Sequence, residues 1–108
     1  MPRALTVSRV TVAEGKEEEY LVAVAELAVL LERRGQHLWI FRNPKQVQQF
    51  LEFTESPSPM SHRSRASRTG DELKLEKRLA AVATYAADAW EMWSEVPLAT
   101  APPEAAGE

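Results

Sequence analysis

The sequence has no cysteine and only two histidines, His37 and His62, among its 108 residues. Without cysteine the chain has no disulfide, no thiolate metal site and no cysteine nucleophile. The separation of the two histidines does not match a zinc-ligand spacing. Glycine-rich phosphate loops and HExxH, EF-hand and GxSxG patterns are also absent. The sequence therefore predicts a protein without a metal or a cofactor, and no motif in it specifies a reaction.

Long apolar runs and an excess of positive charge are missing as well. No run approaches the roughly 20 apolar residues needed to cross a bilayer, and the first residues, MPRALT, lack the apolar core of a signal peptide. Thirteen Lys and Arg against 16 Asp and Glu give a net charge of -3, which argues against a broad basic surface for nucleic acid. We expect a cytoplasmic protein with neither a membrane nor a nucleic acid as partner.

What is present is the composition of one folded domain. Hydrophobic residues make up 44% of the chain and charged residues 27%, close to the averages of globular proteins. A length of 108 residues suits a single core. We therefore predict one domain over residues 1–98. The end of the chain, PLATAPPEAAGE, has the composition of a flexible segment, so residues 99–108 are predicted to form a flexible tail.

The first third of the chain predicts a strand followed by a helix. Leu5–Val12 mixes β-branched and polar residues at the two-residue period of a half-buried strand. The run Glu17–Glu19 suits the first turn of a helix, where carboxylates meet the positive end of the macrodipole. Gly35 supplies a left-handed stop. The apolar face of this helix consists of Tyr20, Val24, Leu27 and Leu31.

The segment QHLWIFRNPKQVQQFLEFTES predicts a β-hairpin with strands at about His37–Arg42 and Phe50–Thr54. Pro44 in the connecting NPKQ turn presets the backbone angle that a β-turn needs at its second position. Large side chains stand at consecutive positions from Leu38 to Phe41. This strand therefore places bulk on both faces of its sheet.

The second half predicts another helix and a last strand. Residues 56–70 are rich in Ser, Pro and Arg and form a long connection. Thr69 and Glu72 have the spacing of a capping box, so a helix is predicted over Asp71–Ala87. Its apolar stripe consists of Leu75, Leu79, Val82 and Ala86. Trp90–Val96, WEMWSEV, reads as a strand ended by Pro97.

The order β-α-β-β-α-β predicts a ferredoxin-like α+β fold, with a four-stranded antiparallel sheet and both helices on one face. The other face is then bare. A bare face with Trp and Phe exceeds what a monomer usually exposes to water. A second copy of the chain is the simplest cover, so a homodimer is expected.

The quoted segments VSRVTVAEGKEEEY, LWIFRNPKQVQQFLEFTES and WEMWSEV carry a family resemblance. From about Leu5 to Leu98 the chain resembles the dimeric α/β barrel superfamily, particularly its antibiotic-biosynthesis monooxygenase-like members. The resemblance implies two sheets facing each other in a shared barrel, and cofactor-independent oxygenation or cyclisation of a small aromatic or polyketide-like molecule. Haem-degrading members typically carry an iron-ligating His on the second helix and an Asn on the first strand. This helix has no His, and the strand offers Ser8 or Arg9, so haem breakdown is not expected.

Two residues are candidates for catalysis. His62, in the Arg-rich connection, has the ordinary pKa of a general base near neutral pH, and the alternative is a solvated loop histidine. Arg9 stands in the central first strand, where Glu52, Glu91 or Glu95 is expected opposite it. It would steady developing negative charge or a substrate carboxylate, and the alternative is a structural ion pair.

The aromatic residues predict a pocket for a flat aromatic ligand between sheet and helices. The predicted lining consists of Tyr20, Trp39, Phe41, Arg63, Trp90 and Trp93. The alternative is that the aromatic residues serve the core or a subunit contact. The two functional hypotheses are therefore a small oxygenase-like or cyclase-like enzyme and a non-catalytic ligand-binding or protein-interaction module.

Overall fold

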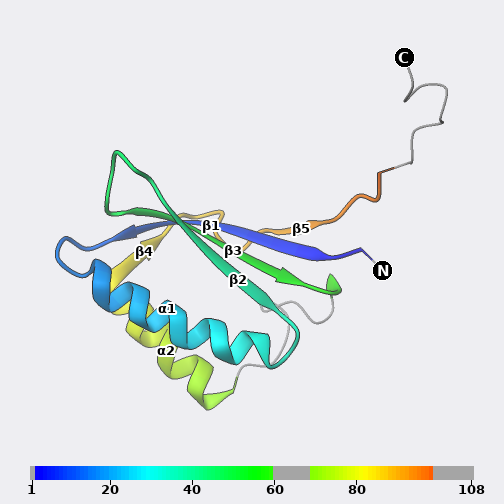
Figure 1. The fold of residues 1–108 in the computed structure, drawn as a ribbon, viewed down its shortest axis with the longest axis horizontal. Helices are drawn as coiled ribbons and strands as arrows, with labels where there is room; N and C mark the ends of the chain where they lie inside the picture. The colour runs from blue at the N-terminus through cyan, green and yellow to red at the C-terminus, as the bar shows by residue number, and fades with distance from the viewer. Residues whose placement is uncertain (1, 60–68, 99–108) are drawn as a thin grey trace.

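The computed structural model describes residues 2–59 and 69–98 (Figure 1). The predicted tail, residues 99–108, lies outside the described residues. In chain order the elements are β1 (Ala4–Val12), α1 (Glu17–Glu32), β2 (His37–Arg42), β3 (Gln49–Ser56), α2 (Gly70–Val82), β4 (Ala83–Tyr85) and β5 (Met92–Ser94).

The strands form one antiparallel sheet in the order β2-β3-β1-β4, and β5 pairs with the other end of β1. Both helices lie against the same face of this sheet (Figure 1). β1 pairs with β3 over most of its length, so β1 is central as predicted. The predicted ferredoxin-like α+β fold is confirmed, with the fourth strand divided into β4 and β5.

The alternation along β1 and β3 separates the two faces of the sheet. In β1 the even-numbered residues Ala4 to Val12 are buried towards the helices, and the odd-numbered ones are half-buried or exposed. β3 alternates in the same way, with Phe50 and every second residue after it buried. The core between sheet and helices consists of Val10, Val12, Tyr20, Ala23, Val24, Leu27, Leu31, Phe50, Leu75, Leu79 and Val82. The predicted apolar face of α1 is therefore confirmed.

The local signals for the helix ends are confirmed. Gly35 has φ +77°, the left-handed conformation expected of a helix stop. The Thr69 hydroxyl accepts from the Glu72 backbone N–H, and the Thr69 N–H donates to the Glu72 carboxylate at 2.9 Å. This reciprocal pair is the predicted capping box, and it starts α2 at Gly70.

The predicted end of α2 is wrong, and the last strand is shorter than predicted. The helix ends at Val82, and Ala83–Tyr85 pairs as β4 with the end of β1. The alanine-rich sequence here contains no glycine or proline to stop a helix. Pairing with the free edge of β1, a long-range contact, overrides the local helix preference. Trp90 lies in a turn, and the strand predicted over Trp90–Val96 is confined to Met92–Ser94.

Candidate functional site

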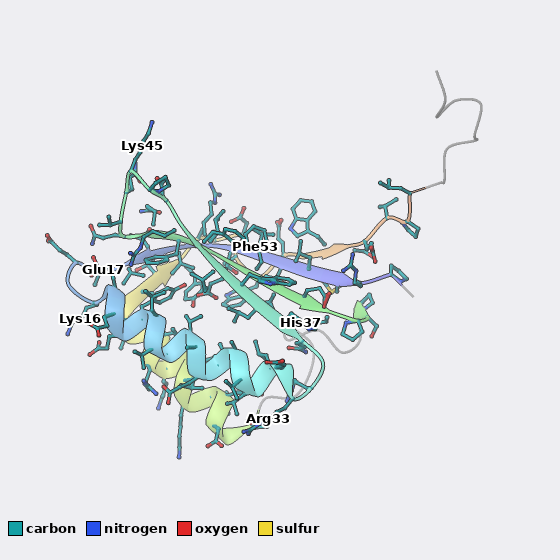
Figure 2. The ribbon with its side chains drawn as sticks, viewed as in Figure 1. Lys16, Glu17, Arg33, His37, Lys45 and Phe53 are labelled. Carbon is teal, nitrogen blue, oxygen red and sulfur yellow. The ribbon has the colours of Figure 1, made fainter. Side chains whose placement is uncertain are left out.

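The sheet face turned away from the helices carries a group of apolar side chains, called here the open face. Its members are Leu5, Val7, Trp39, Phe41, Leu51, Phe53 and Trp93, which cross-strand pairing places on one side. Trp39, Phe41 and Trp93 are 47%, 58% and 59% exposed. Phe41 and Phe53 meet edge to face with ring centroids 5.3 Å apart. Figure 2 labels Phe53 at the middle of the sheet. An apolar surface of this kind is typical of a contact with another molecule.

Arg9 stands within the open face between two depressions of about 390 and 410 Å³. The larger one is lined by Leu5, Val7, Arg9, Leu51, Asp88, Glu91 and Trp93. The Arg9 side chain is well exposed, and its Nη2 lies 3.5 Å from Asp88 Oδ2. Among the described residues the ion-pair partner of Arg9 is therefore Asp88 and not the expected Glu52, Glu91 or Glu95, and Glu52 faces the opposite side of the sheet. An exposed ion pair at this distance contributes little to stability.

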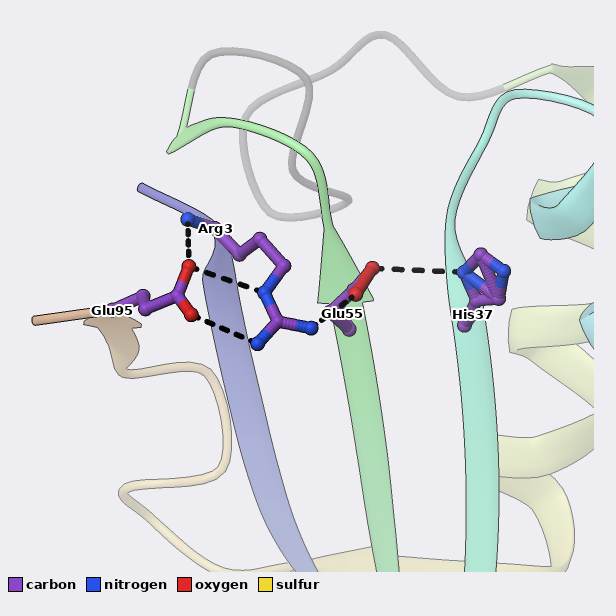
Figure 3. Close-up of polar contacts among 4 residues, drawn as sticks. All are labelled: Arg3, His37, Glu55 and Glu95. Atoms are coloured by element: carbon purple, nitrogen blue, oxygen red, sulfur yellow. Dashed lines mark hydrogen bonds and ion pairs between the residues drawn. The ribbon is translucent and has the colours of Figure 1, made fainter. Parts of the chain in front are cut away.

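A row of charged side chains crosses one end of the open face (Figure 3). Arg3 donates from Nη2 to Glu95 Oε2 at 2.8 Å and from Nε to Oε1 at 3.1 Å. Its Nη1 lies 3.4 Å from Glu55 Oε2, and Glu55 Oε1 lies 3.6 Å from His37 Nδ1. Hydrogen bonds from Arg3 lower the pKa of Glu95 to about 2. This row lies at the end of the sheet where β5 pairs with β1.

The other face of the sheet, under the helices, carries polar side chains at positions that are fully buried. They are Thr6, Ser8, Glu52, Thr54 and Ser56, each at most 3% exposed. All five lie on β1 and β3, at the helix-facing positions nearest the start of β1. Apolar residues suit such positions better, because a buried polar group costs free energy unless it is hydrogen-bonded. We call this set the buried polar surface.

Glu52 is the only carboxyl group of the buried polar surface, and two tyrosines hold it. The Tyr20 hydroxyl, from α1, donates to Glu52 Oε2 at 2.6 Å, and the Tyr85 hydroxyl, from β4, donates to the same oxygen at 2.5 Å. Hydroxyl bonds this short to a carboxylate are among the strong hydrogen bonds in proteins. The second oxygen, Oε1, is buried and has no hydrogen-bond partner among the described residues.

Tyr20, Glu52 and Tyr85 are called here the Glu52 cluster, and the turn between β4 and β5 lies beside it. Ser8, the cross-strand partner of Glu52, donates from Oγ to the Ala89 carbonyl at 2.6 Å. Trp90 follows in the same turn, and its ring stacks on Tyr85 with centroids 5.2 Å apart. Tyr85 is half-buried and Trp90 is 44% exposed. Exposure to solvent therefore rises from Glu52 through Tyr85 to Trp90.

The structure divides the residues of the predicted pocket between the two faces of the sheet. Tyr20, on α1, points into the core between helices and sheet and belongs to the Glu52 cluster, whereas Trp39, Phe41 and Trp93 belong to the open face with Arg9. Trp90 lies at the edge of the Glu52 cluster. His62 and Arg63 lie outside the described residues.

Neither Glu52, which was expected only as a neighbour of Arg9, nor Tyr85 was among the predicted site residues. A signal for Glu52 was present: it is two residues from Phe50 in a strand, so it shares the core-facing side with Phe50. Nothing local indicated Tyr85, because its position depends on the long-range pairing of β4 with β1.

Within residues 2–59 and 69–98 no three His, Cys, Asp or Glu side chains are grouped so that they would hold a metal ion. Of the described helices, none combines the length and the apolar character that crossing a membrane requires.

Comparison with solved structures identifies the class of fold, which is that of the antibiotic biosynthesis monooxygenase-like proteins. SnoaB, a cofactor-independent oxygenase from Streptomyces nogalater, matches with a TM-score of 0.72 and 18% identity, over 94% of this chain and 99% of that one. An antibiotic biosynthesis monooxygenase-like protein from Bordetella bronchiseptica matches with a TM-score of 0.67 and 16% identity, over 90% and 100%. No protein-family model and no curated protein sequence matches the chain. The predicted resemblance is confirmed at the level of the fold.

Proposed function

We propose that the chain is a monooxygenase-like protein that oxidises a small aromatic molecule with dioxygen and without a metal or organic cofactor. The observation that carries this proposal is the buried polar surface under the helices. A sheet that served only packing would have apolar residues there, and five hydroxyl or carboxyl groups are instead buried. A cofactor-independent oxygenase of the same fold supports the class of reaction.

The proposed reaction needs no external reductant, because the substrate supplies the electrons. A hydroxyarene with a free carbon para to its hydroxyl group reacts with dioxygen to give a quinone and water. One oxygen atom enters the ring and the other leaves as water, and both displaced hydrogens end in that water. The protein would exclude bulk water and move protons, which are tasks for hydroxyl and carboxyl groups.

The proposed assembly is a homodimer in which the open faces of two copies meet. Trp39, Phe41 and Trp93 are each about half exposed in the single chain, and a second copy would remove them from water. Burial of apolar area stabilises association by about 25 cal/mol per Å² before the entropic costs of binding. The depressions beside Arg9 would then become enclosed between two sheets, as the barrel expected from the sequence requires.

The activity is tested by incubating the protein with 1-naphthol and following dioxygen consumption and 1,4-naphthoquinone formation. We expect one dioxygen consumed per quinone formed, with no effect of a metal chelator. If neither 1-naphthol nor larger hydroxyarenes are oxidised faster than without protein, the oxygenase proposal is wrong. The alternative function, a non-catalytic ligand-binding or interaction module, would then account for binding without turnover.

The assembly is tested by light scattering of the wild-type chain and of Phe41→Glu. We expect the wild type to have twice the mass of one chain and the variant to have the mass of one chain. Phe41 is 58% exposed, so a charge there is tolerated by the monomer but is costly in an apolar interface. Val29→Glu is the matched control, because Val29 is 50% exposed on the outer side of the helix layer. A wild type that is monomeric at micromolar concentration would refute the dimer.

A further inference from the structure

The Glu52 cluster contains an acceptor that the described part of the chain leaves unused. Glu52 is 1% exposed, and both tyrosine hydroxyls donate to Oε2, so Oε1 has no hydrogen-bond partner among the described residues. A buried acceptor without a donor costs free energy, because it has lost its hydrogen bonds to water. Such a group in a native fold is a candidate for function, since a donor from a ligand would satisfy it.

The surroundings of Oε1 limit which ligand would fit. The carboxyl group is fixed, because hydroxyls from α1 and β4 hold it from two elements. Ser8, directly across on β1, donates its hydroxyl to the Ala89 carbonyl and is not directed at Glu52. The rings of Tyr85 and Trp90 stack beside the cluster, and Trp90 is 44% exposed. A flat molecule with a hydroxyl at its edge matches an aromatic wall beside a single acceptor.

We propose that Glu52 is the proton acceptor of this protein and that Oε1 binds the hydroxyl group of a hydroxyarene. In the step, the O–H bond of the substrate breaks and its proton goes to Oε1, which leaves the electron pair on the substrate oxygen and in the ring. The carboxylate becomes a carboxyl group and the substrate becomes a phenolate. The electron-rich ring is then the species that meets dioxygen. This inference rests on the proposed function and names its substrate class and its base.

Tyr20 and Tyr85 are positioning residues in this arrangement. Each donates to Oε2 and so keeps Oε1 directed away from them. Removing one hydroxyl would leave the carboxyl group held from one side only. Such a residue acts through Glu52 and does not itself take the proton.

The first test measures binding of 1-naphthol under nitrogen, where no oxidation takes place. Quenching of tryptophan fluorescence reports binding in wild type and in Glu52→Gln. We expect 1-naphthol to bind wild type about tenfold more tightly than 1-methoxynaphthalene, which has no hydroxyl donor. This comparison needs no variant, so it holds even if Glu52→Gln does not fold. Equal binding of the two compounds would overturn the assignment of Oε1.

The second test measures oxidation of 1-naphthol by Glu52→Gln, by Tyr85→Phe and by the control Glu18→Gln, an exposed carboxyl at the start of α1. The amide keeps the size of the carboxyl group but is no longer a base, so kcat should fall about 10²- to 10⁴-fold with a much smaller change in KM. Tyr85→Phe should lower kcat less and shift its pH profile, which a purely structural role would not do. Glu18→Gln should match wild type.

The outcomes separate the two proposals. Oxidation by wild type together with full kcat in Glu52→Gln would overturn the role of Glu52 and leave the oxygenase proposal standing. Hydroxyl-dependent binding without any oxidation would refute the oxygenase proposal and keep Oε1 as a ligand acceptor only. Loss of kcat in the folded Glu52→Gln variant, with Glu18→Gln unchanged, supports both.

Discussion

At the scale of single residues, the carboxyl groups of Glu52 and Glu95 lie in opposite environments. Glu52 is buried and accepts two tyrosine hydroxyls, whereas Glu95 is on the surface and is held by the guanidinium of Arg3. Glu95 directly follows β5 and is hydrogen-bonded to Arg3, which directly precedes β1. Glu52 occupies a core-facing strand position where an apolar residue would ordinarily pack, and this is the physical basis for proposing it as a ligand acceptor.

The lowered pKa of Glu95 predicts how the Arg3–Glu95 contact depends on pH. The pKa falls from its ordinary value of 4.5 to about 2, because the Arg3 side chain and backbone donate to the carboxylate. A lowered pKa in the folded state gives stability that is full above the unfolded pKa and is lost as the pH falls through the folded pKa. Thermal unfolding of wild type and Glu95→Gln should therefore differ at pH 7 and converge towards pH 2.

The carboxyl carbon of Glu95 gives a direct measurement of the same contact. Its chemical shift in an NMR titration should have a midpoint near pH 2 in wild type. In an Arg3→Gln variant, which loses the charged donor, the midpoint should rise towards 4.5. An unchanged midpoint in that variant would show that Arg3 is not the cause.

At the scale of elements, α2 has a strong start and an end that another element imposes. The capping box of Thr69 and Glu72 fixes its first turn locally. Its end at Val82 coincides with the start of β4, where the Ala13 N–H donates to the Val82 carbonyl at 2.8 Å. The start is therefore a property of four consecutive residues, and the end is a property of the sheet.

The capping box predicts the effect of Thr69→Ala. The substitution removes the hydroxyl that accepts from the Glu72 N–H, so it should lower the free energy of unfolding by about 1 kcal/mol. Urea denaturation followed by circular dichroism measures this loss. Thr69→Ser keeps a hydroxyl and should recover most of the stability. Equal stability of the alanine and serine variants would show that the cap contributes nothing measurable.

At the scale of the whole molecule, the sheet has one face covered by helices and one face that is apolar and open. The proposed dimer covers the open face and leaves the Glu52 cluster on the outer side of the barrel wall, under the helices. Each chain then keeps its own site. The contact between chains and the chemistry would use opposite faces of the same strands.

The proposed dimer predicts a thermal stability that depends on protein concentration. Association stabilises the folded chain by mass action, so the unfolding temperature of wild type should rise between 1 and 100 micromolar, by about 1–3 °C per tenfold step for a domain of this size. Phe41→Glu should show no such rise. Differential scanning calorimetry measures both, and a wild-type unfolding temperature independent of concentration would contradict the dimer.

The parts of the fold that the sequence predicted correctly depend on residues close together along the chain. His37–Arg42 was predicted with the observed bounds, and Gly35 and Thr69 mark helix ends where the structure has them. The order of elements then restricted the chain to a ferredoxin-like arrangement. The apolar bulk on both sides of β2 followed from the two-residue period of a strand.

The sequence alone thus determined β1, α1, β2, β3, the start of α2 and the apolar character of the open face, because these follow from local hydrogen bonding and periodicity. The tertiary structure decided where α2 stops, because residues 83–85 pair with the edge of β1 and no longer continue the helix. It also decided which side chains meet around Glu52. Tyr20, Glu52 and Tyr85 come from three separate elements, and their distances are set by how the sheet and helices pack, which no local pattern contains.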